Sequence, residues 1–220
     1  MRLAESLYVI DSEGRRILEL ARRDPARPVP QYPEWTMADL LSHVGSILAR
    51  TTQVCLLHPA ERISAPRLPE GEDVGDWYEA ILAEMIGTLD TSDLDVPVWG
   101  FVEGSTIQFW VRRMVVETGV HRWDAEQAFG EETQLRDPVA EHGLDEFVEV
   151  WFPRMGDLPV LEVMAEDLGK TWIYGSGSPE ARVEGSGSDI YLRLMSRPSP
   201  VRLPVDWETA VGNLAPPPKP

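Results

Sequence analysis

The chain has 220 residues, of which 43% are hydrophobic and 26% charged, and its formal net charge is −17 at pH 7. This length is enough for one large domain or two small ones with their own hydrophobic cores. The negative charge argues against nucleic acid as a partner, because phosphate binding depends on clustered Lys and Arg. The single cysteine, Cys55, excludes an internal disulfide framework and a zinc knuckle built from cysteines.

The sequence also argues against a membrane partner. No apolar run approaches the roughly 18 residues that a membrane span needs. Acidic residues interrupt the N-terminal segment MRLAESLYVIDSEGRR, where a signal peptide would have an apolar core. We therefore expect a cytoplasmic protein.

Four helices are expected in the N-terminal part of the chain. Apolar side chains recur at helical spacing from Leu3 to about Arg23, and again from Asp76 to Leu89, so both segments are predicted helices. The four prolines of segment 24–33 remove backbone donors and predict an extended loop after the first helix.

The second helix has the clearest predicted start. Thr36 and Asp39 have the spacing of a capping box, in which each side chain accepts a hydrogen bond from the backbone of the other. The helix that follows places Leu40, His43 and Ile47 on one stripe. His43 is therefore expected to point into the protein.

The fourth helix is expected between Ser105 and Gly130. Ser105 and Gln108 would form its capping pair, and Gly130 suits the left-handed turn that follows a helix. At about 100° per residue, Glu117 and His121 fall on one inward stripe. An unpaired buried charge is too costly to persist, so this carboxylate and imidazole need a partner, and a metal ion would serve both.

Beyond Gly130 the pattern changes. We expect a helix at 138–151, strands at 158–164, 171–174 and 201–207, and a short helix at 188–196. The fold class is therefore α+β, with a four-helix bundle followed by a small α+β domain. The expected boundaries are 1–134 for the metal-binding bundle, 135–214 for the α+β domain and 215–220 for a disordered tail, APPPKP.

Three side chains are predicted to meet inside the bundle: His43 from the second helix, and Glu117 and His121 from the fourth. Two imidazoles and one carboxylate suit Zn²⁺ or another divalent metal, and they leave a position open, as catalytic zinc requires. Asp39 and Asp124 lie about one turn from the two histidines and could each accept a hydrogen bond from a non-ligating ring nitrogen. Alternatively, a Glu-x-x-x-His pair is common without metal, and a core histidine often bonds to backbone.

Two segments resemble a known family. PEWTMADLLSHVG and, further along, FWVRRMVVETGVHRWDAEQAFG are similar to the mycothiol-dependent maleylpyruvate isomerase family, within the DinB-like superfamily of metal-binding four-helix bundles. WIYGSG and GSGSDIYLRLMSR resemble the C-terminal domain of that family. The resemblance implies zinc ligands at His43, Glu117 and His121. It also implies an arginine after the last helix, Arg197, that could hold an acidic substrate; the alternative for Arg197 is an ordinary solvated charge.

The resemblance further implies a zinc-dependent enzyme that uses a low-molecular-weight thiol, mycothiol, to isomerise or S-conjugate a small electrophilic and acidic substrate. The residues do not distinguish an isomerase from an S-transferase. Arg112 and Arg113 could bind a carboxylate, although salt bridges on a helix surface explain them equally well. Two other functions stay open: a non-catalytic DinB-like stress or ligand-binding protein that holds a metal, and a zinc hydrolase. The chain could be a monomer or a homodimer.

Overall fold

The computed structural model describes residues 1–214, 217, 219 and 220 of the chain. They form two compact units, one of residues 1–133 with 219 and 220, and one of residues 134–214 with 217. The predicted disordered tail at 215–220 lies partly outside the described residues, which omit 215, 216 and 218.

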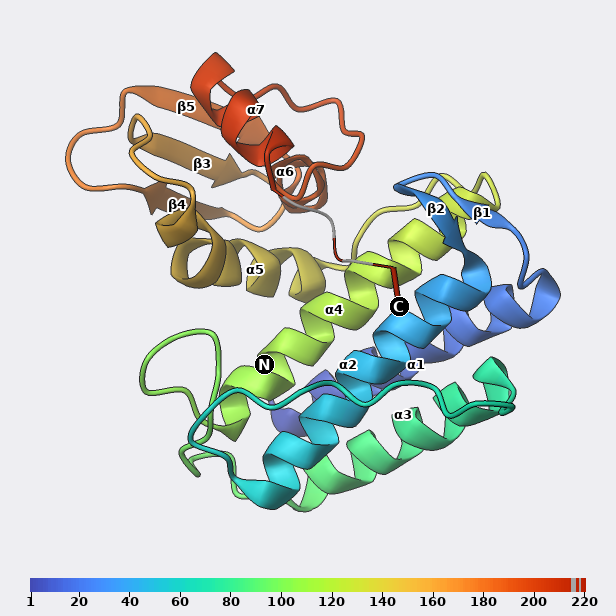
Figure 1. The fold of residues 1–220 in the computed structure, drawn as a ribbon. Helices are drawn as coiled ribbons and strands as arrows, with labels where there is room; N and C mark the ends of the chain where they lie inside the picture. Colours follow the sequence, from blue (N-terminus) through green and yellow to red (C-terminus); the bar gives the residue numbers. More distant parts are fainter. Residues whose placement is uncertain (215–216, 218) are drawn as a thin grey trace. The chain divides into compact units, whose positions relative to one another are not determined.

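The first unit is the predicted four-helix bundle (Figure 1). It consists of α1 (Leu3–Arg23), α2 (Met37–Leu57), α3 (Val74–Thr91) and α4 (Ile107–Ala128). α1 packs against α3 and α4, and α2 packs against the same two helices. This arrangement brings the inward faces of α2 and α4 together, and these faces carry the three predicted metal ligands.

The capping box at the start of α2 is confirmed. The Asp39 backbone N–H donates to Thr36 Oγ1 at 3.3 Å, and the Thr36 N–H donates to Asp39 Oδ2 at 2.8 Å. Two of the orphan donors at the helix start are thereby satisfied, which fixes where α2 begins and hence the direction of the side chains that follow.

The predicted N-cap of α4 is wrong by one residue. Thr106, not Ser105, is the N-cap residue, and it makes no side-chain cap hydrogen bond. The Ser105 hydroxyl instead donates to the Val102 carbonyl at 2.7 Å, so it closes the preceding turn. The far end agrees with the prediction, because Gly130 has the left-handed φ of +71° that ends a helix.

Segment 24–33, predicted as a loop, contributes to a small hairpin. Strands β1 (Pro28–Val29) and β2 (Tyr32–Thr36) pair antiparallel and lead directly into α2. The prolines leave few backbone donors, which limits this ladder to a short one. The hairpin matters because its aromatic side chains reach the site described below.

Among the described residues, α2 is long and apolar enough to cross a membrane by length and composition alone. In its most apolar 18-residue window, however, 61% of the residues are buried inside the structure. This is the pattern of a core helix in a bundle.

The second unit is a small α+β domain. α5 (Asp137–Glu146) continues through a π-helical turn at Phe147–Trp151 into a 3₁₀ turn at Phe152–Arg154. The sheet has the order β4–β3–β5, where β3 (Leu161–Ala165) is antiparallel to β4 (Lys170–Tyr174) and parallel to β5 (Ala181–Gly185). α6 (Gly187–Leu194) and α7 (Val205–Gly212) complete the unit.

One prediction in this unit is wrong, and strand β5 and helix α7 are not predicted by the sequence. The strand expected at 201–207 is not formed: Val201 and Leu203 are buried in an extended segment, and α7 begins at Val205. Asp206 and Glu208 in the first turn favour a helix start, because carboxylates stabilise the positive end of the helix dipole. The sequence does not predict strand β5, since ARVEG is only five residues long and Val183 is its only large apolar side chain.

Candidate metal centre

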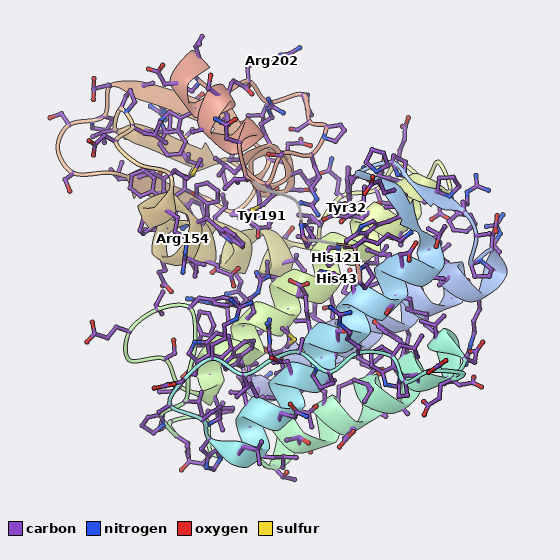
Figure 2. The ribbon with its side chains drawn as sticks, viewed as in Figure 1. Tyr32, His43, His121, Arg154, Tyr191 and Arg202 are labelled. Atoms are coloured by element: carbon purple, nitrogen blue, oxygen red, sulfur yellow. The ribbon has the colours of Figure 1, made fainter. Side chains whose placement is uncertain are left out.

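The structure brings together the three predicted ligands. His43 lies in α2, while Glu117 and His121 lie one turn apart in α4, and Figure 2 shows the two histidines beside each other. One ligand atom from each residue lies within 4.8 Å of the other two. The grouping arises because two packed helices turn these stripes toward each other, so residues far apart in sequence share one interior point.

The distances from Glu117 to the two histidines suit a cation with tetrahedral coordination. The Nε2 atom of His121 lies 3.2 Å from Glu117 Oε1, and the Nε2 atom of His43 lies 3.6 Å from the same oxygen. Ligands at about 2.0–2.1 Å from Zn²⁺ with tetrahedral angles are about 3.3 Å apart. The donor set, two imidazoles and one carboxylate oxygen, is also the kind that zinc prefers.

The carboxylate of Glu117 stays ionised in this setting. Burial raises its pKa, but the positive charge of Arg113 and the neighbouring His121 outweigh burial and hold the pKa well below its usual range. Arg113 Nη2 donates to Glu117 Oε2 at 2.5 Å. This bond occupies one carboxylate oxygen and leaves the other, Oε1, facing the imidazoles.

The pKa values of the two histidines are shifted in opposite directions. Burial lowers the pKa of His43, and the charge of His121 lowers it further, so that the contact with Glu117 only partly compensates. Burial also acts to lower the pKa of His121, but the charge of Glu117 and the hydrogen bond with Asp124 outweigh it and raise the pKa. Without a metal, the cluster therefore holds its proton preferentially on His121.

Asp124 lies where the sequence predicts a partner for His121. Its Oδ2 is 2.9 Å from His121 Nδ1, and the carboxylate is completely buried. With the proton of the ring placed on Nδ1, the Nε2 lone pair points to the Glu117 side, which is the tautomer that a metal ligand needs.

The family match follows this geometry. The family model for the mycothiol maleylpyruvate isomerase N-terminal domain matches residues 10–126, more than half of the chain, including all three clustered residues. The chain belongs to this family. A search of curated proteins found no significant match.

Two solved structures of such an isomerase have the same fold. The crystal structure of the mycothiol-dependent maleylpyruvate isomerase aligns with a TM-score of 0.67 at 14% identity, covering 91% of this chain and 92% of that chain. A crystal structure of a histidine-to-alanine mutant aligns with a TM-score of 0.66, also at 14% identity, covering 87% and 88%. At 14% identity, these two alignments show that the chain shares the fold of that isomerase, and nothing beyond the fold.

The hairpin of this family member supplies aromatic walls that sequence reasoning did not assign to the site. The Trp35 ring lies 5.0 Å from the ring of His43, and Tyr32 stacks on Trp35 at 4.4 Å. Tyr32 also lies 6.1 Å from the His121 ring, and Figure 2 shows it close to both histidines. These rings pack against the histidines and restrict the orientation of the imidazoles. The sequence feature that could have indicated these walls is the pair of aromatic residues in YPEW, directly before the capping box.

Asp39 does not act as a partner of His43 in the structure. Its carboxylate accepts hydrogen bonds from the Thr36 backbone and hydroxyl, both at 2.8 Å, and Lys219 Nζ lies 3.2 Å away. A capping residue cannot also turn toward the next helical turn, because its oxygens are directed back at the helix start. Asp39 therefore positions α2 as a whole.

Arg197, in the second unit, is not the solvated charge considered as an alternative. It is only 7% exposed, and its Nη1 donates to the Met195 carbonyl at 2.9 Å. It follows α6 directly, after Ser196 in a left-handed conformation with φ of 61°. A role for Arg197 in substrate binding stays a prediction.

Proposed function

We propose that the chain is a metal-dependent enzyme of small-molecule thiol chemistry. It uses mycothiol to isomerise or S-conjugate a small, electrophilic and acidic substrate, with Zn²⁺ or another divalent ion as cofactor. The observation that carries the proposal is the meeting of His43, Glu117 and His121 at ligand spacing in a chain of this isomerase family. The proposal includes a cytoplasmic location, no nucleic-acid or membrane partner, a monomer or homodimer, and a substrate contact from Arg197.

Each residue of the site has a defined task in this proposal. The Nε2 atoms of His43 and His121 and one oxygen of Glu117 hold the cation, and Asp124 keeps the proton of His121 on Nδ1. Arg113 holds the Glu117 rotamer through its 2.5 Å contact. When bound, a divalent ion lowers the pKa of a thiol, so that thiolate is present at neutral pH.

The reaction needs no further reagent. The thiolate sulfur adds to one carbon of an activated cis double bond, and the π electrons move to the conjugated carbonyl oxygen as the C–S bond forms. The former double bond then rotates, the electrons return, and the C–S bond breaks to release the trans isomer and the thiolate. In an S-transferase the adduct instead takes up a proton from solvent and keeps the C–S bond.

The ligand count supports catalysis over a structural ion. A structural zinc normally has four protein ligands, whereas catalytic zinc has three and an open position. The three residues that cluster here match the second pattern. The same three ligands are compatible with a hydrolase that uses activated water, so the need for a thiol is the decisive property to measure.

The experiment compares His43→Ala and His121→Ala with a matched histidine control, His58→Asn. His58 is exposed and caps α2 in a left-handed conformation with φ of 46°, which Asn tolerates. We expect about one zinc per chain by elemental analysis in the wild type and the control, and none in the two alanine variants. Turnover of maleylpyruvate should require added mycothiol.

Each other outcome overturns part of the proposal. Zinc retained in both alanine variants would refute the metal site. Turnover without any thiol would identify a hydrolase, and zinc binding without turnover of electrophiles would identify a non-catalytic metal-binding protein. Chelation should leave the helical circular dichroism largely unchanged, since the bundle is held by its apolar core; global unfolding would indicate a structural ion.

A further inference from the structure

A second charged position lies on the same stripe of α2 as His43. Arg50 follows His43 by seven residues, which is two helical turns and roughly 10 Å along the axis. It is only 9% exposed. Its guanidinium carbon lies 5.6 Å from the ring centroids of Trp99 and Trp110 and 6.0 Å from that of Phe101. Arg50 is thus a buried cation enclosed by aromatic rings.

This guanidinium lacks a counter-ion in direct contact. Its Nε atom is buried without a hydrogen-bond partner, and no carboxylate among the described residues lies within salt-bridge distance of Arg50. Aromatic faces stabilise a cation, but they offer no hydrogen-bond acceptor to the buried Nε–H group. Burying hydrogen-bond donors without acceptors is unfavourable, so such a position is expected to have a ligand.

The surrounding charges favour an anion. Burial lowers the pKa of Arg50, Glu117 opposes this, and the positive charges of Arg113 and Arg62 lower the pKa further. The guanidinium stays charged, because arginine titrates far above neutral pH. Arg113 lies over the same Phe101 ring as Arg50, at 5.8 Å, but its charge is shared with Glu117. Arg50 therefore has no contacting carboxylate among the described residues, although the chain has a net charge of −17.

We propose that Arg50 binds a carboxylate group of the small-molecule substrate, in the ring-lined position formed by Trp99, Phe101 and Trp110. A planar guanidinium matches a carboxylate in a bidentate contact. The roughly 10 Å between Arg50 and His43 along α2 is a distance that a short dicarboxylate and two side chains span. That the ligand is the substrate rests on the proposed function, whereas carboxylate binding is measurable without turnover.

The test is a titration with maleate followed by tryptophan fluorescence, because Trp99 and Trp110 flank the guanidinium. Arg50→Met removes the charge, Arg50→Lys keeps it without the planar fork, and Arg15→Gln is the control, an exposed arginine paired with Asp11 on α1. We expect Arg50→Met to weaken maleate binding on the order of 10- to 100-fold, the lysine variant to be intermediate, and the control to be unchanged.

Two comparisons identify the ligand chemistry and the place of binding. The uncharged analogue maleamide should bind wild type and Arg50→Met equally weakly, and inorganic phosphate should bind the wild type less tightly than maleate. In His43→Ala, which cannot hold the metal, maleate binding should persist and should still depend on Arg50. Loss of binding in His43→Ala would place the maleate on the metal and overturn the inference. Tighter binding of phosphate would overturn the choice of a carboxylate.

Thermal stability distinguishes a binding role from a structural one. A guanidinium kept for a ligand is a buried charge without an acceptor in the free protein, so Arg50→Met should melt at the same temperature as the wild type or higher. A lower melting temperature combined with unchanged maleate affinity would mean that Arg50 only holds the rings together, and would refute the proposal. If maleate binding depends on Arg50 but no thiol-dependent turnover is found, the proposed function fails and the carboxylate site stands.

Discussion

The partner of His121 provides a quantitative test of the metal centre. Asp124 is completely buried and lies 2.9 Å from His121 Nδ1, so Asp124→Asn keeps an acceptor of the same shape and removes only the charge. A hydrogen bond to a charged group contributes about 1.5–3 kcal/mol and a neutral one about 0.5–1.5 kcal/mol. The difference, about 1–2 kcal/mol, corresponds to roughly 5- to 30-fold in the zinc Kd.

Asp124→Ala removes the bond altogether and should weaken zinc further, by roughly 100-fold, which is the upper range for losing such a partner. The assay is competition for zinc against a chromophoric chelator of known affinity, at a pH where the chelator does not titrate. Asp90→Asn, an exposed carboxylate on α3, is the control and should bind zinc like the wild type. If both Asp124 variants bind zinc as tightly as the wild type while His121→Ala loses it, the reasoning about the tautomer of His121 is refuted.

Two further predictions concern stability. Burial raises the pKa of Glu126, but hydrogen bonds from Thr133 and from arginine side chains outweigh it and lower the pKa below 4.5. The stabilisation from ionised Glu126 is therefore present above pH 4.5 and is lost as the pH falls through the pKa of the folded state. Glu126→Gln should lower the free energy of unfolding by about 1–3 kcal/mol at pH 7, measured by urea unfolding, and by progressively less in acid. A loss of stability that does not depend on pH would contradict this. Gly45→Ala would put a Cβ 2.3 Å from the Trp77 ring and should destabilise by about 1–3 kcal/mol. Gly87→Ala, with nothing within 4 Å, should stabilise by up to about 1 kcal/mol, and equal effects of both would refute the packing argument.

The bundle could be predicted because its signals are local. Helical periodicity and the Thr36–Asp39 capping box are properties of neighbouring residues, and both are found where the sequence indicates. The elements that were missed depend on distant partners. Strand β5 exists because β3 offers a free edge, and the alternating apolar residues at 201–203 are buried without forming a ladder. Local patterns cannot distinguish an extended buried segment from a paired strand.

The same distinction applies to the site. The spacing of Glu117 and His121 on one helix fixes their shared face, so that part follows from periodicity. The inward stripe of α2 also indicates His43, but periodicity does not show which helices pack together, and the family resemblance supported the grouping of His43 with the two residues of α4. Most of the aromatic rings around the histidines and Arg50 come from the hairpin and from the segment between α3 and α4, whose positions depend on tertiary packing; Trp110 of α4 is the exception. Sequence periodicity does not reach such irregular segments.

Two clusters of buried charged residues that involve α4 differ in how their charges are balanced. In the first, Arg122 contacts both Glu13, at 2.6 Å, and Glu126, and Arg16 extends the network to Glu131 at 2.7 Å. Its cations are all paired with carboxylates, so this network can join α1 to α4 without any ligand.

The second cluster, formed by residues of α4 and α2, is not balanced in this way. Arg113 is paired with Glu117, but Glu117 also faces two imidazoles, and Arg50 has no carboxylate in contact among the described residues. A protein gains nothing in stability from an incomplete set of buried charges, because each unpaired group retains its desolvation cost. The imbalance is explained if a cation binds to the imidazoles and Glu117, and an anion binds to Arg50. Simultaneous loss of stability in His121→Ala and Arg50→Met, without loss of either ligand, would show instead that the second cluster is as structural as the first.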